Sequence, residues 1–115
     1  MIEKSITFLK EETCVKFVHI DPKIHPVHYI HVMEDLKVDY CYSHLGYQHL
    51  VNPQNGRAQP LSLRRPACFY PGTIQHEFLH ALGVDHEQNR PDRDDHICVY
   101  YKNIRTSELT HITVT

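Results

Sequence analysis

Residues 76–86 read His-Glu-Phe-Leu-His-Ala-Leu-Gly-Val-Asp-His, and this run constrains the fold more than any other part of the sequence. His76 and His80 are four residues apart, so on an α-helix their side chains lie on the same face. Both imidazoles can then reach one metal ion from a rigid backbone. The run therefore predicts a helix over about residues 73–83, with Thr73 as its N-cap.

The rest of the run supplies a third imidazole and a carboxylate. Gly83 falls where the helix is expected to stop, because glycine tolerates the left-handed conformation common at helix ends. A turn there would bring His86, in a loop over residues 84–96, to the same ion. Three histidines with an open fourth position are typical of catalytic zinc. Glu77 lies beside the ligands, where a carboxylate can act as general base and then general acid on a zinc-bound water.

The histidine content allows a second interpretation of this run. The chain has 11 histidines in 115 residues, so His pairs at ligand-like spacing arise easily by chance. An ordinary amphipathic helix would explain His76 and His80 alone. Gly83 and His86 both fall where the longer pattern requires them, which favours the zinc site.

Several further segments resemble the astacin family of zinc endopeptidases within the metzincin group. Residues 86–94 resemble that family's H-E-x-x-R-x-D-R-D continuation. Other matches are T-C-V/I-x-F at 13–17, C-x-S-x-x-G at 41–46, Q-x-x-S-L at 59–63, and a cysteine followed by Gly-Thr-Ile at 68 and 72–74. The matches follow in the family's order and cover about residues 9–104. The resemblance implies a metalloendopeptidase in which His76, His80 and His86 hold one Zn²⁺ per chain and Glu77 is catalytic.

The resemblance also implies an α+β fold. Residues 1–115 would be part of an astacin-like peptidase domain: the upper, N-terminal subdomain, a twisted sheet with the active-site helix, and no lower subdomain. It implies that a peptide or protein substrate lies extended along an edge strand at Tyr42, Ser43 and His44. A plain strand with solvent-facing polar residues explains these three at least as well. A Cys41–Cys68 disulfide and a secreted, extracellular location are implied as well.

One part of the family pattern has no counterpart after Ile104. It is an S-x-M-H-Y segment, which carries a methionine turn beneath the zinc and a tyrosine near it, whereas the methionines here are Met1 and Met33. Two hypotheses follow. The first is a zinc metalloendopeptidase that hydrolyses peptide bonds by a zinc-activated water with Glu77 as general base. The second is a truncated, non-catalytic zinc-binding module.

The N-terminal residues predict a helix rather than a signal peptide. Ile2, Ile6 and Leu9 mark one helical face that ends before Thr13, and charged residues interrupt the run. No apolar run is long enough to span a membrane. A net charge of −2 makes nucleic acid an unexpected partner.

Strands are expected at residues 14–20, 28–33 and 39–44, with a loop at 52–56 before the segment at 61–63. Four cysteines allow three pairings. Cys98 lies in an apolar, strand-like run over residues 97–101, where a small buried hydrophobe is the preferred interpretation over a partner for Cys14. The charged residues after His86 are expected to form ion pairs that fix this loop rather than a solvated run: Arg90, Asp92, Arg93 and Asp94.

Overall fold

A computed structural model describes residues 1–25, 27–48 and 57–112. The chain forms two compact units, Met1–Val84 and Asp85–Thr115. The loop expected at residues 52–56 lies outside the described residues. Among the helices that are described, none has the length and apolar character needed to cross a bilayer.

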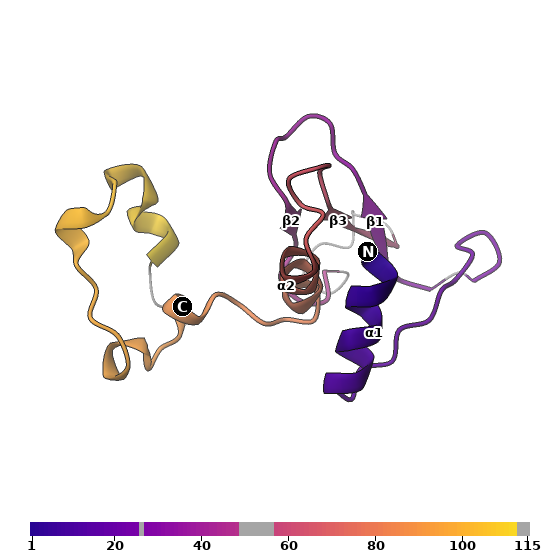
Figure 1. Ribbon diagram of the computed structural model, residues 1–115, viewed down its shortest axis with the longest axis horizontal. Coiled ribbons are helices and arrows are strands. Elements are labelled where there is room, and N and C mark those ends of the chain that lie inside the picture. The colour runs from indigo at the N-terminus through magenta and orange to yellow at the C-terminus, as the bar shows by residue number, and fades with distance from the viewer. Residues whose placement is uncertain (26, 49–56, 113–115) are drawn as a thin grey trace. The chain divides into compact units, whose positions relative to one another are not determined.

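The first unit contains a mixed three-stranded sheet (Figure 1). β1 (Tyr29–Met33) pairs in parallel with β3 (Ala58–Ser62), and β2 (Tyr42–Ser43) pairs antiparallel with the other side of β3. The strand order is therefore β1-β3-β2, with β2 at an edge of the sheet. Leu61, on the central strand, is fully buried. The last strand in the sequence thus forms the middle of the sheet.

Two helices complete the core of this unit. α1 (Ile2–Glu12) and α2 (Pro71–Ala81) contact each other, and α2 also contacts β2 and β3. The predicted face of α1 is confirmed, since Leu9 is buried and its two isoleucines pack against the core. The buried apolar cluster is Leu9, Leu61, Leu63, Cys68, Ile74 and Phe78. The predicted α+β class is confirmed.

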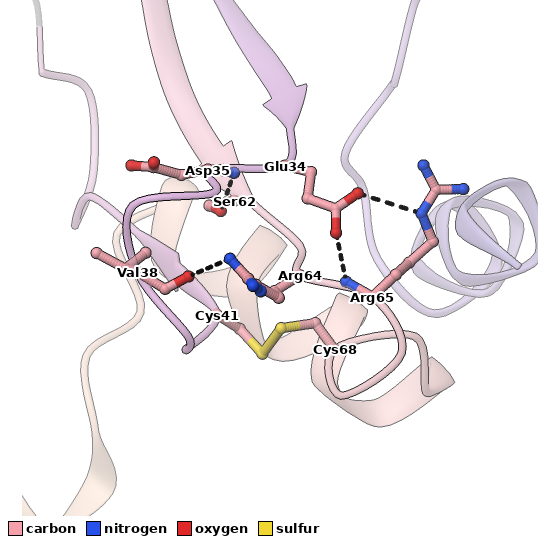
Figure 2. Close-up of a disulfide and its surroundings, with 8 residues drawn as sticks. All are labelled: Glu34, Asp35, Val38, Cys41, Ser62, Arg64, Arg65 and Cys68. Atoms are coloured by element: carbon pink, nitrogen blue, oxygen red, sulfur yellow. Dashed lines mark hydrogen bonds and ion pairs between the residues drawn. A yellow bond between two sulfur atoms is a disulfide. The ribbon is translucent and has the colours of Figure 1, made fainter.

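A disulfide between Cys41 and Cys68 joins the segment before β2 to the turn before α2 (Figure 2). Cys68 is fully buried in the core. Four polar contacts tie the β1–β2 connection to the end of β3 and the residues after it. They are Arg64 Nη1 to Val38 O at 2.9 Å, Arg65 N to Glu34 Oε1 at 3.0 Å, Arg65 Nε to Glu34 Oε2 at 3.4 Å, and Asp35 N to Ser62 Oγ at 3.1 Å. One disulfide and these four polar contacts therefore hold the same two segments together.

The expected strands are only partly found. The strand at 28–33 is β1, but the one at 39–44 shrinks to Tyr42–Ser43. β3, at Ala58–Ser62, is not among the expected strands. Residues 14–20 form no strand, because nothing in the described part of the chain pairs with their backbone. Phe17 anchors this extended segment by packing edge-on against Phe78, with ring centroids 5.5 Å apart.

The second unit is built from short 3₁₀ helices: η2 (Glu87–Asn89), η3 (Arg93–Asp95), η4 (Tyr101–Asn103) and η5 (Thr106–Ile112). Arg93 organises the unit, since its side chain is buried and donates to Gln88 O and to the Tyr101 hydroxyl, each at 2.9 Å. It also pairs with Asp94 at 3.3 Å. These contacts confirm that the charged residues after His86 fix this segment.

Arg90 makes the more exposed ion pairs of the second unit. Its guanidinium contacts Asp92 at 2.8 Å and Glu87 at 3.2 Å. The hydrogen bond from Arg90 lowers the pKa of the Asp92 carboxyl. Because these groups are largely exposed, solvent screens the pairs and each contributes little to stability.

The expectation for Cys98 is wrong. Residues 97–101 form no strand, and both Cys98 and its neighbour Ile97 are exposed. Apolar composition favours a strand only where a sheet is present to receive it. Cys14 is also exposed, and neither of these two cysteines forms a disulfide.

Candidate metal centre

The helix α2, which carries the first two histidines, begins earlier than the sequence pattern predicts. It spans Pro71–Ala81 rather than about residues 73–83, and its N-cap is Tyr70 rather than Thr73. Proline is well suited to the first helical position, because its φ is already helical and it lacks an N–H that would have no partner there. Pro71 therefore starts the helix, and Thr73 lies within the first turn.

The end of α2 is a glycine-dependent turn, as predicted. The N–H of Gly83 donates to His80 O at 2.8 Å, and the N–H of Val84 donates to Leu79 O at 3.0 Å. This pair of bonds is the Schellman motif, which satisfies carbonyls left over at a helix end. Gly83 has φ +98°, a conformation that L-residues with a side chain rarely adopt.

We expect Gly83→Ala to lower the free energy of unfolding by about 1–2 kcal/mol, the cost of left-handed backbone for a residue with Cβ. Gly72→Ala is the matched control, because Gly72 is helical and nothing lies within 4 Å of a Cβ added there. That control should stabilise by up to ~1 kcal/mol. Urea unfolding of the metal-free chain measures both. Equal effects from the two alanines would contradict the role given to Gly83.

The structure brings the three predicted histidines together. His76, His80 and His86 each offer a ring nitrogen, and these atoms lie within 4.8 Å of one another, so one metal ion could be held among them. Nδ1 of His80 lies 2.8 Å from Val84 O. A carbonyl oxygen only accepts, so Nδ1 carries the proton and Nε2 keeps the lone pair that can bind a metal.

Glu77 is buried next to this cluster, with a relative exposure of 5%. Its Oε2 atom has no hydrogen-bond partner among the described residues. Burial raises the pKa of the Glu77 carboxyl, and the electrostatic effect of nearby His80 opposes this rise. A buried carboxylate oxygen without a partner is costly, and a metal-bound water would satisfy it. Three imidazoles and such a carboxylate fit a catalytic zinc centre.

The three predicted edge-strand residues lie at the edge of the sheet and just beyond it. Tyr42 and Ser43 form β2, and His44 follows as an exposed residue. The hydroxyl of Tyr42 donates to Asp35 Oδ2 at 3.1 Å, so this phenol is held against the β1–β2 connection.

A contact that sequence reasoning missed joins this edge to the helix. The backbone N–H of Gly46 donates to His80 O at 2.8 Å. The glycine in the C-x-S-x-x-G segment is the one local sign that this loop turns sharply, and Gly46 indeed has φ +68°. No pattern in the sequence indicates which carbonyl the loop reaches.

Comparisons with known proteins agree with this site. The family model for astacin, which describes a peptidase family, matches residues 1–115. High choriolytic enzyme 2 of Oryzias latipes is 38% identical over 103 residues, which are 90% of this chain and 32% of that protein. Zinc metalloproteinase nas-4 of Caenorhabditis elegans is 44% identical over 94 residues, which are 81% of this chain and 26% of that protein.

A solved structure shows the same relationship. High choriolytic enzyme 1, a hatching enzyme zinc-protease from Oryzias latipes, superposes with a TM-score of 0.81 at 33% identity. The match covers 99% of this chain and 50% of that one. The family model and the solved structure together show that this fold is that of a peptidase family. The chain belongs to the astacin family, and it spans about a third of the length of the first of these relatives.

Proposed function

We propose that this chain is the zinc-binding part of an extracellular metalloendopeptidase. The observation that carries the proposal is the convergence of His76, His80 and His86 beside the buried Glu77, whose Oε2 accepts no hydrogen bond from the described residues. His76 and His80 are held by α2, and the turn at Gly83 leads the chain toward His86. An expected disulfide, Cys41–Cys68, is present and is typical of an oxidising compartment.

When bound, zinc lowers the pKa of a coordinated water and polarises the carbonyl of the peptide bond to be cleaved. The protein residues do the rest of the chemistry. Glu77 accepts a proton from the attacking water at Oε2 and passes it to the leaving amine. Val84 O fixes the tautomer of His80, which keeps Nε2 directed to the metal site.

The edge strand provides a place for the substrate backbone. β2 is at the edge of the sheet, and an extended peptide can add to such an edge through main-chain hydrogen bonds. Tyr42, Ser43 and His44 would then set the register of the peptide at the metal centre. At this edge the substrate would therefore be recognised mainly through hydrogen bonds to its main chain.

The proposal is tested by incubating the zinc-loaded chain with a library of unstructured peptides. We expect one zinc per chain, cleavage that stops when a chelator removes the metal, and recovery when one equivalent of zinc is returned. Zinc binding without any cleavage would instead support the non-catalytic zinc-binding module. A chain that binds no zinc would contradict both functions.

His80→Ala is expected to weaken zinc binding by more than the roughly 10–100-fold that loss of an outer-shell hydrogen bond costs. The reason is that it removes a direct ligand rather than a partner of a ligand. His31→Ala is the control, since His31 is an exposed histidine on β1 outside the cluster. Competition with a chromophoric chelator measures both affinities. Equal affinities for the two variants would contradict the ligand assignment.

A further inference from the structure

Gln59 is a polar residue in the middle of the core sheet, and its side chain is almost wholly buried, with 2% exposed. Burying an amide is unfavourable unless its donors and acceptor are all used. Here they are used on a single loop. Nε2 donates to Gly46 O at 2.9 Å and to His44 O at 3.4 Å, and Oε1 accepts from the backbone N–H of Gln48 at 3.1 Å.

The loop that Gln59 holds is the loop that contacts the metal-binding helix. Gly46 donates its N–H to His80 O at 2.8 Å, and the same carbonyl also accepts from Gly83 at 2.8 Å. A Cβ built on Gly46 would lie 3.7 Å from the Cα of Gly83, so the two backbones are packed together. The loop and the last turn of α2 therefore share one acceptor, the carbonyl of a proposed zinc ligand.

These bonds form a continuous connection from the sheet to the zinc site. Gln59 sets the position of Gly46, Gly46 bonds the backbone of His80, and the turn after His80 places Val84 O against the His80 ring. Groups that fix the orientation of a metal ligand raise the metal affinity, because that side chain then loses less conformational entropy when the metal binds.

We propose that Gln59 is a positioning residue for the zinc centre: through the loop at residues 44–48 it holds His80 in the orientation that binds metal. The proposal rests on the proposed function, since it takes His80 to be a ligand. It also couples the substrate edge to the metal, because His44 and Gly46 continue directly from β2. A shift of the edge strand would thereby reach a zinc ligand through these hydrogen bonds.

The test compares Gln59→Met with Gln48→Ala in the full chain. Gln59→Met keeps a side chain of similar length and removes all three hydrogen bonds. Gln48→Ala removes a side chain from the same loop, one that bonds Leu45 O at 2.6 Å, but keeps the backbone N–H that Gln59 accepts. We expect Gln59→Met to weaken zinc binding by about 10-fold and to change the visible spectrum of the Co²⁺-loaded chain. Gln48→Ala should change neither.

A purely structural role for Gln59 would give a different result. It would lower the urea midpoint of Gln59→Met and leave zinc affinity and the Co²⁺ spectrum as in the wild type, which would overturn the proposal. Equal losses of affinity in the two variants would also overturn it. A wild-type chain that binds no zinc would refute the proposed function itself, so the two failures are distinguishable.

Amide hydrogen exchange in the wild-type chain tests the same connection even if Gln59→Met does not fold. Coupling between sites is reciprocal, so zinc binding should strengthen the Gly46 to His80 hydrogen bond. Exchange of the Gly46 N–H should slow on zinc addition by more than that of the Leu63 N–H, which donates to Met33 O at 2.9 Å in the sheet. Equal slowing at both amides would reflect global stabilisation alone and would overturn the proposal.

Discussion

Replacing Glu77 with glutamine is expected to lower peptide hydrolysis by about 10²–10⁴-fold while one zinc ion stays bound, because a general base normally contributes that much. Glutamine has nearly the same size as glutamate, so the packing around this buried position is kept. Its amide, however, cannot take a proton from the attacking water. The measurement is the turnover number on a cleaved peptide, together with zinc content by atomic emission.

Glu3→Gln is the control for this prediction. Glu3 is an exposed glutamate on α1, and its replacement should leave turnover and zinc content unchanged. Full activity in the Glu77 variant would refute its role in proton transfer. Loss of zinc from that variant would show that Glu77 supports the metal centre instead.

Removing the Cys41–Cys68 disulfide is expected to lower the free energy of unfolding by about 3–4 kcal/mol, because the bridge closes a loop with a sequence separation of 27 residues. The double variant Cys41→Ala/Cys68→Ala removes this restriction on the unfolded chain. It also leaves a small void where Cys68 is fully buried. Urea unfolding of the metal-free protein measures the change.

The chain provides a matched control for the disulfide. Cys14 and Cys98 are exposed and form no disulfide, so Cys14→Ala/Cys98→Ala should change the unfolding free energy by less than about 0.5 kcal/mol. A large loss in this second pair would indicate that these thiols have partners in solution. If Cys41→Ala/Cys68→Ala lowered the unfolding free energy by as little as the control does, the disulfide would contribute little to the stability of this fold.

The metal centre could be predicted from the sequence because its geometry is mostly local. His76 and His80 are related by helical spacing, and Gly83 is required by the turn that ends α2. The residue at which α2 begins could not be predicted. Thr73 and Pro71 are both favourable at a helix start, and local preference alone does not decide between them.

Other features depend on partners that lie far away in the chain. Residues 14–20 have strand composition but no neighbouring strand in the part of the chain that is described, and Cys98 has apolar neighbours but no core around it. The hydrogen bond from Gly46 to His80 joins residues that are 34 positions apart in the sequence. It is made by backbone atoms, which are the same in every residue, so no sequence pattern indicates it. Such contacts are set by the tertiary fold, which overrides local preference.

The position of β3 in the middle of the sheet also determines when this unit can fold during synthesis. β1 and β2 are not neighbours, and each pairs with β3. A nascent chain that ends before residue 58 therefore contains β1 and β2 but not β3, the strand with which both of them pair. Pairing of β1 with β3 closes a loop of more than 20 residues, which is slow compared with forming a hairpin. The sheet and the bridge to Cys68 can therefore form only after the chain has been made past β3.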